Sequence, residues 1–196
     1  MFDLFLGLVG FAWVSSFTPG PNNMMLMASG ANFGFTRTLP HMSGVLFGFT
    51  AMVGVVGLGL MQVFDAVPLS YTLLKAVSVV YLLWLAWKVA HAASPKEARH
   101  SGQPITFLQA LLFQWVNPKA WAMALTAISV YAPDRTATAV WAVAVIFGLV
   151  TMPAIVGWSL FGQQLQRFLT TPRRLTAFNW TMAALLVASL LPVLAV

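Results

Sequence analysis

Six apolar stretches, each at least 20 residues long, take up nearly the whole chain. They are residues 4–27, 42–64, 68–89, 107–130, 137–161 and 175–196. A helix of about 20 residues is long enough to cross the ~30 Å hydrocarbon core of a bilayer. Only 7% of the residues are charged, against about 25% in an ordinary soluble domain. The sequence therefore predicts an all-α integral membrane protein with six transmembrane helices.

Prolines interrupt two of these stretches. The first contains Thr18-Pro19-Gly20-Pro21-Asn22-Asn23, and the fourth contains Asn117-Pro118-Lys119. Proline lacks a backbone donor and clashes with the preceding turn, so we expect both helices to break. Broken helices in corresponding halves of a membrane protein point to the binding site of a secondary transporter. The predicted substrate-binding residues are Thr18, Pro19, Gly20, Pro21, Asn22, Asn23, Asn117, Pro118 and Lys119.

A polar loop, residues 91–106, divides the predicted single transporter domain, residues 1–196, into halves of about 1–90 and 107–196. Each half has three spans, so halves that are structural repeats must run in opposite directions, with the two breaks meeting near the bilayer centre. Basic residues gather at the loops after the first, third and fifth spans, which predicts that these loops are cytoplasmic and both termini periplasmic. These residues are Arg37, Lys88, Lys96, Arg99, Arg167, Arg173 and Arg174.

Lys119 is the most informative charge in the sequence. It lies about 12 residues, or ~18 Å, into the fourth stretch, near the bilayer centre. A lysine at that depth costs about 2.5–3.5 kcal/mol on insertion scales, so it should face a partner or a cavity. No carboxylate is placed to pair with it, since all four acidic residues fall at span ends or in loops. Its partner is then either the carboxylate of the substrate or the carbonyl groups freed at the first break.

The three asparagines beside the breaks also have two interpretations. Asn22, Asn23 and Asn117 can cap the half-helices and satisfy their orphan backbone groups. Alternatively, the half-helix that begins near Asn22 directs its amides and positive dipole end at an anion. The freed carbonyls of residues 17–19 would then accept an ammonium. Together these groups suit a zwitterion.

Several classes of function are disfavoured by what the sequence lacks. It contains no cysteine, nucleophile motif, phosphate-binding loop or paired carboxylates, so we predict neither an enzyme nor a cofactor. The three histidines have no ligand spacing, which argues against a metal site, and His41 is expected at the membrane interface. The net charge of +6 is spread over span ends, so nucleic acid is not an expected partner. Membrane lipid is.

The second stretch is rich in glycine. Gly44 and Gly48 form a small-xxx-small pair that lets two helices approach closely. The sequence leaves open whether the partner helix lies in the same chain or in a second copy, so a homodimer is one outcome.

The chain combines the motifs at the two breaks with Gly34, Gly44 and Gly48 and with Tyr-Leu-Leu-Trp-Leu-Ala-Trp-Lys at residues 81–88. This combination resembles the LysE/RhtB family of amino-acid exporters. The resemblance covers the whole chain and is greatest to the branch that exports cysteine and O-acetylserine. It implies efflux of an amino acid or small derivative across the bacterial inner membrane, driven by the proton gradient. It does not fix the substrate.

The leading functional prediction is a secondary transporter that exports a small amino acid or derivative by alternating access. The alternative is a passive channel or facilitator for small polar solutes, in which the same broken helices line a continuous pore. The sequence places no carboxylate inside a predicted span to carry a proton. If protons drive transport, Lys119, Lys75 or His41 would have to carry them.

Overall fold

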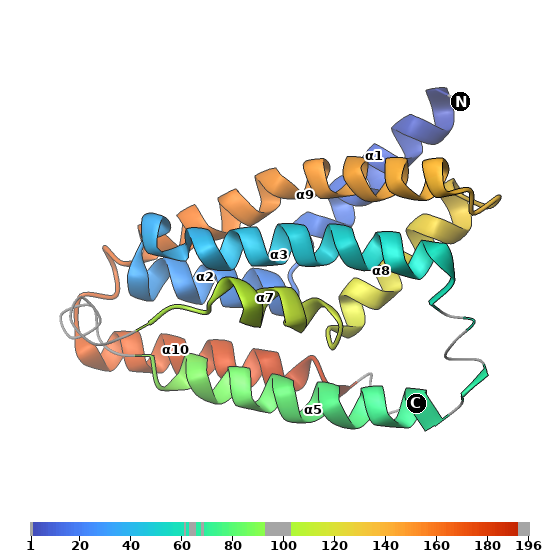
Figure 1. The fold of residues 1–196 in the computed structure, drawn as a ribbon. Coiled ribbons are helices and arrows are strands. Elements are labelled where there is room, and N and C mark those ends of the chain that lie inside the picture. The colour runs from blue at the N-terminus through green and yellow to red at the C-terminus, as the bar shows by residue number, and fades with distance from the viewer. Residues whose placement is uncertain (1, 61, 63–65, 68, 93–102, 192–196) are drawn as a thin grey trace.

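The computed structural model describes residues 2–60, 62, 66–67, 69–92 and 103–191. Every element in this part is helical, as Figure 1 shows, which confirms the all-α prediction. The elements are α1 (Phe2–Phe17), α2 (Pro21–Phe33), α3 (Phe35–Val55), the π-helical segment η1 (Val56–Leu60), α5 (Leu69–Ala90), α7 (Phe107–Gln114), α8 (Pro118–Tyr131), α9 (Ala137–Leu165) and α10 (Pro172–Ala188).

Three helical runs in the described residues are long and apolar enough to cross a bilayer: Phe35–Leu60, Thr72–Ala90 and Ala137–Leu165. The pair α1 and α2 makes a fourth if it is one broken span, bent by 55° at the break. Helices α7, α8 and α10 have 8, 14 and 17 residues and do not reach that length singly. The structure therefore supports three or four candidate spans, and six spans in two inverted halves stay a prediction.

Most of the helices run roughly along one direction (Figure 1). Helix α2 packs against α9, α3 packs against both α7 and α9, and α5 lies beside α10. One apolar cluster joins α2, α5 and α7 through side chains such as Leu26, Leu85 and Phe113. A second cluster joins α3, α8 and α9 through Phe49, Ile128 and others. The cavity described below lies where these two clusters meet.

Basic residues gather at one end of the bundle. The α2–α3 turn, the end of α5, the start of α7 and the α9–α10 connection all lie there, on the left of Figure 1. That end carries Arg37, Lys88, Arg167, Arg173 and Arg174. Residues 93–102 of the predicted polar loop, with Lys96 and Arg99, lie outside the described residues. Which end faces the cytoplasm remains a prediction.

The predicted end of the first span, at residue 27, is wrong. Helix α2 continues to Phe33, and the small residues 28–30, which follow the predicted span end, are buried inside it. Their size serves packing, because a Cβ at Gly30 would overlap the backbone carbonyl of Ser159 in α9. The actual turn is Gly34, whose φ of 79° lies in the region that favours glycine.

Gly44 and Gly48 pack within the chain. A Cβ at Gly44 would overlap the carbonyl oxygen of Phe107, and one at Gly48 would lie 2.8 Å from the Cα of Leu111. Both contacts are with α7, so these two glycines bring α3 and α7 together. They do not supply a dimer interface, and a homodimer stays a prediction without support from them.

His41 is fully buried among protein side chains, and its expected place at the membrane interface stays a prediction. Helix α3 begins at Phe35, seven residues before the predicted start of the second span at residue 42. His41 therefore falls inside the bundle, where its Nδ1 lies 2.9 Å from the hydroxyl oxygen of Ser29.

Candidate substrate site

The first predicted break is present between α1 and α2. Helix α1 ends at Phe17 and α2 begins at Pro21, where the missing proline amide removes no helical hydrogen bond. Gly20 between them is fully extended, with φ −171° and ψ 178°. The last carbonyl groups of α1 consequently lose their partners in the helix.

Asn23 satisfies part of this freed backbone. Its side-chain amide donates to the carbonyl oxygens of Ser16 at 2.8 Å and Thr18 at 3.0 Å. It therefore caps the end of α1 from the first turn of α2, and this contact holds the two half-helices at their bent angle.

The second break separates α7 from α8. Helix α7 ends at Gln114 and α8 begins at Pro118. The side-chain oxygen of Asn117, itself 1% exposed, accepts from the backbone amide of Lys119 at 3.1 Å. Asn117 is therefore the N-cap of α8, which matches the capping interpretation for this residue.

The two breaks contact each other. The side-chain amides of Asn22 and Gln114 bond reciprocally, at 2.8 Å and 3.1 Å. The Lys119 ammonium donates to the carbonyl oxygen of Thr18, 101 positions away in the sequence. Of the two partners expected for Lys119, the substrate carboxylate or a carbonyl group freed at the first break, it has the carbonyl group in this conformation.

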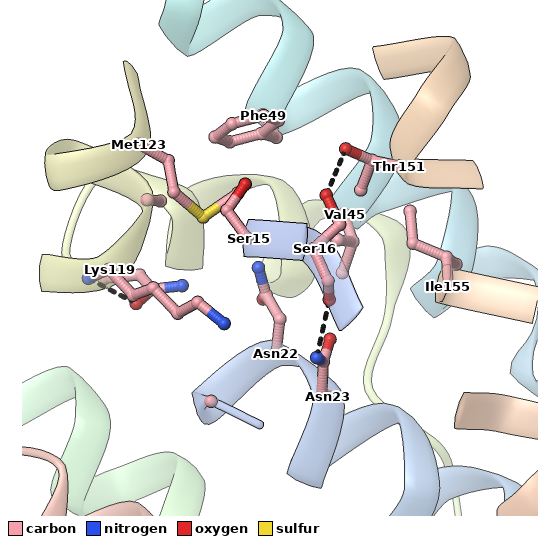
Figure 2. A pocket seen from close by; sticks show the side chains of 13 residues that line it. Ser15, Ser16, Asn22, Asn23, Val45, Phe49, Lys119, Met123, Thr151 and Ile155 are labelled. Atoms are coloured by element: carbon pink, nitrogen blue, oxygen red, sulfur yellow. Dashed lines mark hydrogen bonds between the residues drawn. The ribbon is translucent and has the colours of Figure 1, made fainter. Parts of the chain in front are cut away.

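A small cavity lined by both polar and apolar side chains lies at this junction (Figure 2). Its volume is about 30 Å³, which is room for about two waters at the roughly 10–15 Å³ that each requires. An amino acid does not fit there unless side chains move. The lining residues are Ser15, Ser16, Gly20, Asn22, Asn23, Val45, Phe49, Asn117, Lys119, Ala120, Met123, Thr151 and Ile155.

Five of the nine predicted residues line this cavity: Gly20, Asn22, Asn23, Asn117 and Lys119. The other four, Thr18, Pro19, Pro21 and Pro118, do not line it. Thr18 takes part through its carbonyl oxygen, and the prolines end or begin the half-helices around it.

Sequence reasoning missed the contribution of α9. The hydroxyl oxygens of Ser16 and Thr151 lie 2.8 Å apart, and Thr151 also donates to the Phe147 carbonyl in its own helix. A threonine two positions before Pro153, inside an otherwise apolar stretch, was the available signal. Figure 2 shows both hydroxyls at the wall of the cavity, on the opposite side from Lys119.

The start of α2 is the part of the site best suited to an anion. Its N-cap residue, Gly20, has no side chain to accept from the first amides, and the asparagine side chains that follow bond elsewhere. These first amides have no acceptor within the helix, and the positive end of the helix dipole lies with them. A carboxylate placed there would also be within the range of movement of the Lys119 side chain.

We expect Gly20→Ala to impair transport without unfolding the protein. A Cβ at this position would lie 2.7 Å from Cδ of Lys119, so the lysine side chain must move, whereas the extended backbone accepts any residue. Misplacement of a binding group by about 1 Å can lower a rate roughly 100-fold, so we expect export to fall about tenfold or more. Export rate and thermal stability, measured together, check this.

Gly10→Ala is the matched control, because a Cβ there would meet no atom within 4 Å. Normal export by Gly20→Ala would contradict the placement of Lys119 against Gly20.

The fold and the site together define a class of protein, a multi-pass helical membrane protein whose broken helices meet at a small cavity. The sequence matches the family LysE type translocator over residues 5–196, and the chain belongs to that family. It is therefore a transporter of the inner membrane and not an enzyme.

Relatives of known name cover most of the chain. The cysteine/O-acetylserine efflux protein of Klebsiella pneumoniae is 31% identical over 177 residues, which are 89% of this chain and 88% of the relative. The proteins of the same name from Escherichia coli K12 and Shigella flexneri are each 30% identical over 178 residues, 89% of both chains. No solved structure matches the chain.

Proposed function

We propose that the chain exports a small zwitterionic amino acid or derivative from the cytoplasm, with cysteine and O-acetylserine as the first candidates. Family membership supports amino-acid export, and the named relatives supply the candidate substrates. The observation that carries the proposal is the contact of the Lys119 ammonium with the Thr18 carbonyl oxygen, because it joins the two broken helices at the central cavity.

The substrate would replace this contact by two others. Its carboxylate would take the Lys119 ammonium and the first amides of α2, where a negative charge is favoured. That exchange would free the Thr18 carbonyl oxygen to accept from the substrate ammonium, with the Ser16 and Thr151 hydroxyls nearby. A zwitterion satisfies both groups at once, whereas a simple cation or anion leaves one of them unpaired. The site would therefore prefer free amino acids.

Export would proceed by alternating access of six spans arranged as two inverted halves. The central cavity is too small for an amino acid in this conformation, which fits a state with the site closed around Lys119. Both termini would lie outside, because the basic end of the bundle is the one expected in the cytoplasm. The proton gradient is the proposed driving force.

Counterflow in proteoliposomes distinguishes this carrier from the alternative, a passive channel. Vesicles loaded with unlabelled O-acetyl-L-serine are placed in a trace of the labelled compound. A carrier should accumulate label transiently above equilibrium, since each outward step returns a site that can bind label. A channel gives no overshoot, and protein-free vesicles measure leakage. Equilibration without overshoot would contradict alternating access.

A further inference from the structure

A second, larger cavity lies at the basic end of the bundle, between the last two turns of α2 and the end of α5. Its volume is about 290 Å³, against about 30 Å³ for the central cavity. A molecule of amino-acid size therefore fits this cavity without rearrangement. It is lined by Ala28, Ser29, Asn32, Phe33, Trp87, Lys88, Val89, His91, Ala92, Gln103 and Ile105.

The two cavities lie along one face of α2. Asn22 lines the central cavity and Ser29 the second one, and positions seven apart fall on the same side of a helix, about 10 Å along its axis. Between them on that face are Met25 and Leu26, both 0% exposed. Their side chains pack in the apolar cluster with Leu85, so apolar packing separates the two cavities along this face in this conformation.

Lys88 gives the second cavity a positive charge. Its ammonium donates to the side-chain oxygen of Gln109 at 2.8 Å and to the Pro104 carbonyl at 3.4 Å, and it lies 5.8 Å from the centre of the Trp84 ring. All three partners are neutral. Among the described residues no carboxylate pairs with Lys88, so this charge is available for an anion.

Two polar residues that α2 contributes to the lining, Ser29 and Asn32, are held in place by buried partners. Ser29 is 4% exposed, and its hydroxyl oxygen lies 2.9 Å from Nδ1 of the buried His41 ring. Asn32 is fixed by a reciprocal amide pair with Asn179, at 2.7 Å and 3.0 Å. Gln103 and Trp87 also line the cavity. The side-chain oxygen of Gln103 can accept from an ammonium, and the Trp87 ring can face one. The cavity therefore offers groups for both ends of a zwitterion.

We propose that this cavity is a second binding site for the exported amino acid. The site would hold the amino acid, with the substrate carboxylate on Lys88, before the substrate passes along α2 to the central site. The proposal rests on the proposed export function and adds to it a place and a residue for loading. From this site the substrate would reach Asn22 and Lys119 once Met25 and Leu26 of α2 move away from Leu85 of α5.

Uptake of labelled O-acetyl-L-serine by inside-out membrane vesicles tests this site, because such vesicles expose the cytoplasmic end. We expect Lys88→Gln to raise the half-saturating concentration about tenfold with little change in maximal rate, as expected when a charged hydrogen bond is lost in binding alone. Lys88→Arg should restore most of the affinity. Arg173→Gln removes the same charge at the same end of the bundle, outside the cavity, and should have no effect.

An unchanged half-saturating concentration in Lys88→Gln would overturn the proposal. So would a fall in maximal rate alone, which would give Lys88 a structural role. Direct titration separates this outcome from failure of the export function. Purified Lys119→Met protein should still bind O-acetyl-L-serine weakly, and the added Lys88→Gln change should remove that binding whether or not the protein transports. Equal binding by the single and double variants would reject the second site.

Discussion

Lys119→Met is expected to abolish export while the protein still reaches the membrane. The variant keeps an unbranched side chain one atom shorter but removes the ammonium that contacts Thr18 and, in the proposed cycle, the substrate carboxylate. A hydrogen bond to a charged group is worth about 1.5–3 kcal/mol, which is roughly a 10- to 150-fold loss of binding. Resistance of cells to a toxic exported amino acid, with membrane protein quantified by immunoblot, measures the effect.

Lys119→Ala should behave in the same way, because the loss is of charge and not of shape. Lys119→Arg keeps the charge and should retain part of the activity. Full resistance in Lys119→Met cells would remove this lysine from the site.

Gly162→Ala is expected to cause the largest loss of stability. A Cβ at Gly162 would overlap the backbone carbonyl of Met27, just as one at Gly30 would overlap that of Ser159. These obstacles are backbone atoms, so α2 and α9 must separate along their shared contact. Overpacking lowers the free energy of unfolding by about 1–3 kcal/mol. We expect Gly162→Ala to lower it by about 3 kcal/mol or more, which corresponds to a drop in Tm of about 6 °C or more.

Gly157→Ala is the matched control on α9, because a Cβ there would meet only a ring carbon of Phe17, at 3.9 Å. It should leave Tm unchanged. Thermal unfolding of the purified proteins in detergent gives both values, and equal Tm values for the two variants would contradict the close approach of α2 and α9.

Local chemistry in the sequence was enough to place the breaks. Pro21 and Pro118 forbid a continuous helix, and the structure ends α1 and α7 before them and begins α2 and α8 at them. The depth of Lys119 in an apolar stretch predicted that it needs a polar partner, and its contact with the Thr18 carbonyl is one of the two that were expected. Whether the nine predicted residues bind substrate stays open to the tests above.

Tertiary contacts decided what the sequence did not reveal. The pairing of Ser16 with Thr151 joins positions 135 apart, and no local pattern specifies which helices become neighbours. The small residues 28–30 have the composition of a connection, yet they are helical because α9 approaches α2 at Gly30. Gln114 stands beside the second break in the sequence, but its role became clear only from its amide pair with Asn22.

The central claim is that Lys119 exchanges the Thr18 carbonyl for the carboxylate of the substrate. Calorimetric titration with O-acetyl-L-serine and with its carboxamide tests it most directly, in a Lys88→Gln background in which binding at the second site is weakened. We predict that this protein binds the acid at least about tenfold more tightly than the amide, and that adding Lys119→Met removes most of the difference. An undiminished preference for the acid in the double variant would contradict the claim.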